Sequence, residues 1–329
     1  MIFWELQVNK PIAMRDALLR RILESMKTDK EIFFMSGDFG SPVLDRIRSD
    51  YPDRFINVGV AEQNLINVSA GLALEGYKVF SYAIAPFITM RCFEQLRVNL
   101  ALLSEVREIN VNLIGVGAGY SYVVSGPTHQ CYEDISLIRS LPNFQLFSAS
   151  DHHIASHLFD KSISVSGPKY IRLDAQILPP LREKLNENDL SDGFEVLRTG
   201  QKGLIIATGY MTHTALAVAK ELDLDGLGLA VIDLFDLTGF NQDKLISNFN
   251  DQPTIFSMEE GFKGRGGLDA IITEILKRNS LKINFESIGV KPGYSFELGS
   301  RQDLHELVGI GQNSAIEMIK TSLNKPFGP

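Results

Sequence analysis

Three short segments of the chain carry side chains that could do chemistry. Glu62 follows an apolar run in FINVGVAEQ and opens a stretch rich in small residues. Phe87, Met90 and Phe93 recur at the spacing of one helix face, and His129 follows a glycine–proline turn in SGPTHQ. A carboxyl group can share a proton with a ligand, a helix face of this kind can hold a flat ring, and an imidazole can transfer protons near neutral pH.

Each segment also has a purely structural explanation. The helix dipole favours a glutamate in a first helical turn, an apolar stripe usually faces a core, and a loop histidine usually lies on the surface. GVGAG lacks the GxGxxG pattern of a dinucleotide site. His153 and His157 lack the glutamate of HExxH, so a solvated helix face explains them better than zinc. No metal site is predicted, and the three segments are informative only in combination.

The elements that must position these segments alternate between helices and strands. This alternation predicts a parallel sheet covered by helices, because each strand must return to the same edge through a crossover. The expected helices are Ala13–Met26, Ala61–Glu75, Ala85–Leu103, Glu133–Ser140 and Asp151–Ile163, and the expected strands are Glu31–Ser36, Lys78–Ala83, Ile109–Val116, Phe144–Ser148 and Tyr170–Leu173. Reactive groups in such folds follow the carboxyl ends of strands, which is where Glu62 and His129 are expected.

A change in composition divides the chain into two domains. Between Ile177 and Gly203, prolines, charges and asparagines replace the apolar periodicity, which indicates a surface linker. A second alternation follows, from GLIIATG through GLAVIDL and PTIFSM to a helix over Gly267–Lys277. We therefore expect one domain with its linker over residues 1–190 and a smaller α/β domain over residues 191–329.

Composition and charge exclude several classes of protein. The 329 residues are 44% apolar and carry a net charge of −8, which disfavours both disorder and a nucleic-acid partner. The sequence contains no basic-then-apolar leader and no apolar run long enough for a membrane span. Cys92 and Cys131 are too few for a disulfide framework. A cytoplasmic location is expected.

In order along the chain, FINVGVAEQNLI, PFITMRCFEQ, SGPTHQ and SLPNFQLFSASD resemble the pyrimidine-binding domain of the transketolase family, which includes deoxyxylulose-phosphate synthase. SMEEGFKGRGG is similar to that family's C-terminal domain, so the resemblance covers almost the whole chain. It implies an α/β fold of two parallel-sheet domains, a thiamine diphosphate pyrimidine-binding domain followed by a transketolase C-terminal domain.

The resemblance also implies roles for the three segments. Glu62 matches the glutamate that hydrogen-bonds a ring nitrogen of the aminopyrimidine and promotes its imino tautomer, so that the cofactor can do the difficult chemistry. Phe87 matches the aromatic residue against the pyrimidine, with Met90 and Phe93 on the same face. His129 matches a histidine that serves proton transfer at the substrate.

The match is weaker for other residues that the family uses. Asp38, in SGDFGSP, matches an aspartate near the cofactor, and Arg15 keeps a basic residue of the substrate site. Ser125 stands where the family usually has an aspartate that contacts a donor hydroxyl. Arg172 lies close to an expected basic position without an exact match.

Three positions lack the side chains that help the family hold a substrate phosphate. Gly117 and Ala118 occupy the places of a histidine and an arginine, and Ala175 occupies the place of an arginine. We therefore expect a substrate that either lacks the usual sugar phosphate or binds it through other residues.

The chain lacks the GDG motif and following asparagine that hold magnesium and the diphosphate in the family's other half. The resemblance thus implies a beta-type subunit that pairs with an N-terminal diphosphate-binding subunit, as an α2β2 assembly, with magnesium bound through the partner. The complete enzyme would transfer a two-carbon ketol unit from a ketose to an aldose. The alternatives are a pyruvate-decarboxylating synthase, a 2-oxo acid dehydrogenase beta subunit, which GPTHQ disfavours, and a catalytically silent scaffold.

Overall fold

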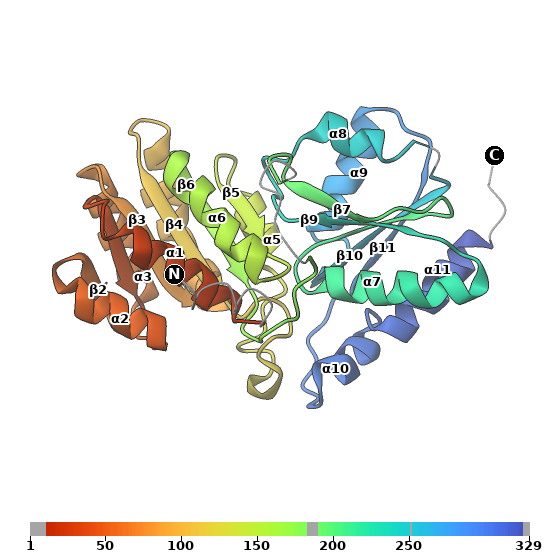
Figure 1. Ribbon diagram of the computed structural model, residues 1–329, viewed down its shortest axis with the longest axis horizontal. Coiled ribbons are helices and arrows are strands. Elements are labelled where there is room, and N and C mark those ends of the chain that lie inside the picture. Colours follow the sequence, from red (N-terminus) through yellow and green to blue (C-terminus); the bar gives the residue numbers. More distant parts are fainter. Residues whose placement is uncertain (1–10, 183–189, 251, 325–329) are drawn as a thin grey trace, which may run out of the picture.

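The computed structural model describes residues 11–182, 190–250 and 252–324, and it confirms the expected α/β fold with two sheets (Figure 1). The first sheet is parallel throughout, with the strand order β2-β1-β3-β4-β6-β5. Its strands are β1 (Ile32–Ser36), β2 (Phe55–Asn57), β3 (Lys78–Ile84), β4 (Asn110–Val116), β5 (Gln145–Ser148) and β6 (Gly167–Leu173). Their central residues are almost all buried, as expected for a sheet with helices on both faces.

Helices cover both faces of the first sheet. The helices α1 (Met14–Ser25), α2 (Pro42–Asp50) and α6 (His152–Ser164) share one apolar cluster, and α3 (Glu62–Leu74) and α5 (Asp134–Arg139) contribute to a second. Asp151 begins α6 as predicted, because its Oδ1 accepts a hydrogen bond from the Ile154 amide at 3.0 Å. The helix α2 was not predicted, although Ser41 caps it and Pro42 occupies its first turn.

The second sheet has the order β11-β10-β8-β9-β7, and only β7 runs antiparallel to its neighbour. Its strands are β7 (Phe194–Arg198), β8 (Leu204–Ala207), β9 (Ala230–Leu234), β10 (Thr254–Phe262) and β11 (Asn284–Val290). Its helices are α7 (Met211–Leu222), α8 (Gln242–Ser247), α9 (Leu268–Arg278), α10 (Arg301–Val308) and α11 (Gln312–Leu323). None of the helices within the described ranges is long and apolar enough to span a membrane.

Two sequence predictions differ from the structure. The linker expected over Ile177–Gly203 is shorter, because β7 lies inside that range and pairs with β9. The helix expected over Ala85–Leu103 is interrupted. Its backbone widens into π-helical turns at Phe87–Arg91 and Leu96–Leu102, which flank the short α4 (Phe93–Gln95).

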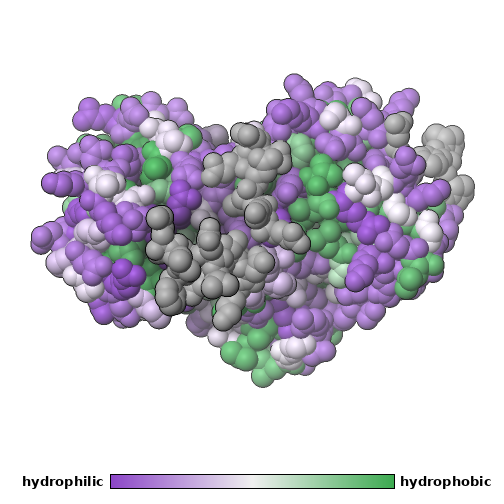
Figure 2. Space-filling model, viewed as in Figure 1, coloured by the Kyte–Doolittle hydropathy of each residue, from purple (hydrophilic) through white to green (hydrophobic). Residues whose placement is uncertain are grey.

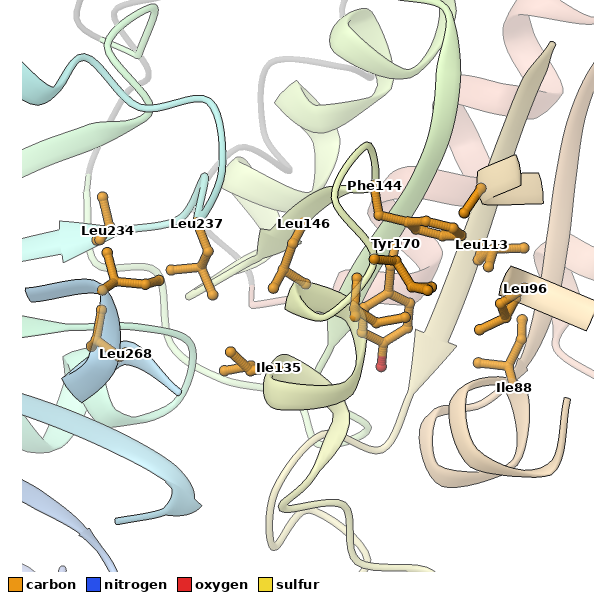
Figure 3. Packing of buried hydrophobic residues seen from close by; sticks show 14 of the residues in the cluster. Ile88, Leu96, Leu113, Ile135, Phe144, Leu146, Tyr170, Leu234, Leu237 and Leu268 are labelled. Atoms are coloured by element: carbon orange, nitrogen blue, oxygen red, sulfur yellow. The ribbon is translucent and has the colours of Figure 1, made fainter. Parts of the chain in front are cut away.

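One hydrophobic core runs through both domains (Figure 3). Ile135 and Leu146 of the first domain lie between that domain's sheet and the side chains of Leu234, Leu237 and Leu268 from the second domain. All five are almost completely buried, so the contact removes apolar surface of both domains from water. The two sheets are therefore held together by a shared interior.

Candidate functional site

The predicted site residues follow the carboxyl ends of four neighbouring strands. Asp38 comes after β1, Glu62 after β2, Phe87 after β3 and His129 after β4, and these strands are adjacent in the order β2-β1-β3-β4. Because the strands are parallel, all four residues belong to the same edge of the sheet. The chain reverses direction across the sheet between β2 and β3, and open α/β sheets bind ligands at such switch points.

Glu62 is the first residue of α3, and its side chain is fully buried. The Arg91 guanidinium, 45% exposed, donates a hydrogen bond from Nη1 to Glu62 Oε2 at 2.7 Å. The second carboxylate oxygen, Oε1, is buried without a hydrogen-bond partner. A buried polar atom of this kind is costly unless something else bonds to it, so it marks a position where a ligand donor would fit.

Phe87 connects Glu62 to His129 through Arg91. The Arg91 guanidinium carbon lies 4.4 Å from the centre of the Phe87 ring, a cation–π contact. The ring of His129 meets Phe87 edge-on, with 5.2 Å between centroids, and Thr128 Oγ1 lies 2.9 Å from His129 Nδ1. The structure thus brings together the carboxyl, aromatic and imidazole groups that the sequence indicated, with Arg91 between them.

Met90 and Phe93 lie in the same segment but in different surroundings. Met90 is 38% exposed, whereas Phe93 is half-buried and packs against the core that the two domains share. The π-helical turns shift their angular positions away from those of a regular α-helix. No contact of either residue with Phe87 or Glu62 is recorded within the described ranges.

Asp38 is held at the edge of the site by the neighbouring strand end. Its backbone is left-handed, with φ of 67°, and the Asn57 side chain both donates to Asp38 Oδ1 at 3.0 Å and accepts from the Asp38 amide at 3.1 Å. A non-glycine residue in this conformation is uncommon and frequently belongs to a functional site. The Asp38 side chain is exposed.

The positions expected to contact substrate show how the missing side chains are replaced. Gly117 has a positive φ of 101°, and the Tyr122 ring fills the space beside it, because a β-carbon on Gly117 would lie 2.0 Å from that ring. Arg15 is half-buried and bonds to Asp16 at 3.0 Å, and its charge also acts on Tyr122. Burial raises the pKa of Tyr122 to about 12, so its hydroxyl remains a donor at neutral pH. Ser125 is exposed.

Arg172 is not available to a substrate. It is buried and donates from Nε to Asp134 Oδ2 at 2.8 Å, and the Tyr170 hydroxyl donates to the same oxygen at 2.9 Å. This group is an internal ion pair. Arg91 and Tyr122, by contrast, lie at the site and were not predicted. The position of Arg91, four residues after Phe87, was the available signal for the first, and nothing in the sequence indicated the second.

The fold and these residues define a two-domain α/β subunit with its polar groups at one sheet edge. Two family models match it: transketolase, pyrimidine binding domain, over residues 10–180, and transketolase, C-terminal domain, over residues 192–314. The chain belongs to the transketolase family, as the sequence resemblance indicated.

Its relatives include single subunits of divided enzymes. One of the two subunits of the apulose-4-phosphate transketolase of Actinobacillus succinogenes is 27% identical over 93% of this chain and 96% of its own length. The 6-deoxy-6-sulfo-D-fructose transketolase subunit SqwH of Clostridium sp. is 28% identical over 90% of each chain. A solved structure, described as a split gene transketolase, inactive beta4 tetramer, superposes with a TM-score of 0.83 at 27% identity and covers 95% of this chain and 99% of its own.

Proposed function

We propose that this chain is the pyrimidine-binding subunit of a split transketolase, which transfers a two-carbon ketol unit from a ketose donor to an aldose acceptor with thiamine diphosphate. The observation that carries the proposal is the buried Glu62 carboxylate, whose unpartnered Oε1 lies in the same group as Phe87, Arg91 and His129. Relatives named as transketolase subunits, matched over nearly their full length, support the reaction type.

The residues present fit the pyrimidine half of thiamine diphosphate. Glu62 Oε1 is a buried acceptor that needs a partner, and a ring nitrogen that shares a proton would provide one. Phe87 offers an aromatic surface to a flat ring. When bound, the cofactor supplies the nucleophilic carbon that attacks a ketose carbonyl, while Glu62 holds the proton at the ring nitrogen. Met90, Phe93 and Asp38 are proposed to complete the cofactor pocket.

Arg91 must be part of this binding event. Its guanidinium covers a face of Phe87 and bonds to Glu62, so a ring placed on that face would replace it. Since Arg91 is 45% exposed, it has room to move away from the ring. His129 is proposed to move a proton at a substrate hydroxyl, because its imidazole lies beside Phe87 and its Nδ1 is oriented by Thr128.

We infer that the substrate is held by an unusual set of groups. Tyr122 fills the space beside Gly117, and Ala175 adds no charge, so Arg15, Ser125 and His129 remain as the proposed substrate contacts. Two relatives are named for a phosphorylated and a sulfo-substituted sugar. A substrate with one anionic group near Arg15 fits this arrangement.

The proposed enzyme requires a second subunit for the diphosphate and magnesium. A structurally similar protein is described as an inactive beta4 tetramer of a split transketolase, which supports the view that such a chain does not turn over alone. We propose an α2β2 assembly in the cytoplasm, in which the partner covers the carboxyl edge of the first sheet.

The test combines this chain with candidate diphosphate-domain subunits and titrates thiamine diphosphate with Mg²⁺ into each preparation by calorimetry. Binding is expected only in the complex. Glu62→Gln is expected to weaken binding or abolish turnover, because the amide cannot hold the same proton.

Glu94→Gln is the matched control, since Glu94 lies in the neighbouring segment with its side chain exposed. It is expected to behave like the parent chain. Unchanged turnover of Glu62→Gln at saturating cofactor would remove the proposed role of Glu62. Absence of cofactor binding in every combination would favour a catalytically silent scaffold.

A further inference from the structure

The loop that carries His129 is closed at its base. Gly119 and Cys131 form an antiparallel bridge in which each amide donates to the other's carbonyl at 2.9 Å. The residues between them project from the lower edge of the molecule in Figure 1, where Figure 2 shows apolar surface, and Val124 at the tip is 85% exposed. A projecting loop of this kind keeps its shape only if its base is fixed.

The base of this loop rests on a carboxylate of the second domain. Glu260, near the end of β10, is almost completely buried, and its Oε1 accepts a hydrogen bond from the Tyr120 amide at 3.1 Å. Gly119 approaches so closely that a β-carbon there would lie 2.1 Å from Glu260 Oε2, and its φ is +54°. Only a residue without a side chain fits this contact.

Glu260 is itself fixed by a set of charged partners. Arg301 donates to Glu260 Oε1 from Nε at 3.0 Å and to Oε2 from Nη2 at 2.8 Å, and His305 Nε2 lies 2.8 Å from Oε1. Burial alone would raise the pKa of Glu260, but Arg301 and His305 outweigh it and hold the pKa well below its ordinary value. Arg301 Nη1 also pairs with Asp174 at 2.7 Å, just after β6. Two segments at the carboxyl edge of the first sheet thus meet at one ion-pair cluster.

We infer that Glu260 is a positioning residue, through which the C-terminal domain sets the place of the His129 loop at the active site. Its two oxygens hold the loop base and Arg301 simultaneously, and a neutral side chain cannot form the same bidentate pair. The inference rests on the proposed function for its effect on turnover, but the contact itself can be tested without catalysis.

The experiment measures amide hydrogen exchange of the full chain and turnover of the complex with its diphosphate subunit. In Glu260→Gln, the amides of Gly119, Tyr120 and Cys131 are expected to exchange at least about tenfold faster, because a charge-assisted hydrogen bond is lost. Turnover should fall by about tenfold or more while thiamine diphosphate affinity changes by less than about twofold, since the cofactor residues remain in place.

Glu259→Gln is the matched control, because Glu259 is the adjacent buried carboxylate and accepts only from backbone amides, including Asp269 at 3.2 Å. It should leave the loop amides unchanged. If Glu260→Gln does not fold, Gly119→Ala perturbs the contact from the loop side, and the same amides should exchange faster while those of β10 do not.

The inference is overturned if Glu260→Gln leaves the loop amides as protected as in the parent chain, if Glu259→Gln exposes them equally, or if Gly119→Ala leaves both loop and turnover unchanged. A parent complex without turnover would instead count against the proposed function, while the exchange result would still decide the role of Glu260.

Discussion

Arg182 should contribute more to stability than any exposed ion pair of this chain. It is buried and pairs with Asp151 at 2.9 Å, Glu195 at 2.6 Å and Asp233 at 2.8 Å. Asp151 begins α6 of the first domain, whereas Asp233 belongs to β9 of the second, and both carboxylates are fully buried. Arg182→Met would keep an unbranched stem of similar length and remove the charge that compensates them.

The expected loss follows from what remains around the two carboxylates. Asp233 would keep its hydrogen bonds from Ser150 and Thr212, and Asp151 would keep those from the Ile154 and Leu181 amides. Both groups would stay hydrogen-bonded but would lack a counter-charge. Breaking a buried pair costs about 3–5 kcal/mol, and we expect the lower end, about 3 kcal/mol, because these donors persist.

Urea unfolding followed by circular dichroism measures this change. With a slope of about 3 kcal/mol per molar, the midpoint should fall by about 1 M. Arg48→Met is the control, because Arg48 pairs with Asp45 at the surface, with both side chains more than half exposed, and such pairs contribute about 0–1 kcal/mol. Equal effects of Arg182→Met and Arg48→Met would refute the argument.

Three further changes have defined outcomes. Burial, and then the charge of Asp269, raises the pKa of Glu259 to about 7 from 4.5, so the folded chain keeps a proton that the unfolded chain releases and stability falls as the pH rises through this range. Glu259→Gln should therefore remove a slope of about 1.4 kcal/mol per pH unit from urea unfolding between about pH 4.5 and 7. Burial lowers the pKa of Lys169 from 10.5 to about 7, so stability should rise with pH between these values, and Lys169→Met should abolish that rise in the same assay at alkaline pH. Arg91→Met should lower the free energy of unfolding by about 2–4 kcal/mol, because it leaves the buried Glu62 carboxylate without its partner, and a loss below about 1 kcal/mol, measured by urea titration, would contradict this.

Much of the fold could be predicted because apolar periodicity reports burial directly. The strands that begin near Glu31, Lys78 and Ile109 are continuous apolar runs, and the structure places each of them in the interior of the first sheet. The strand β7 was missed because it lies at a sheet edge and its FEVLR sequence alternates with exposed and charged positions. Its pairing with β9 depends on a tertiary contact that no local pattern records.

The candidate site was predictable in its residue types but not in its connections. Glu62, Phe87 and His129 lie in ordered motifs after strand ends, and their grouping follows from parallel topology. The Arg91 contact with both Glu62 and Phe87 depends on π-helical turns, which a regular helical period does not predict. The Tyr122 ring beside Gly117 depends on the path of an irregular loop.

The core shared by the two sheets also limits how this chain can recombine with its relatives. Leu234, Leu237 and Leu268 present to Ile135 and Leu146 a surface shaped by both domains. A chimera joined between the domains would have to match two apolar surfaces and the ion pairs of Arg182 at once. Exchange between homologous genes should therefore preserve the two domains as one inherited cassette, with crossovers tolerated in exposed loops rather than at the junction.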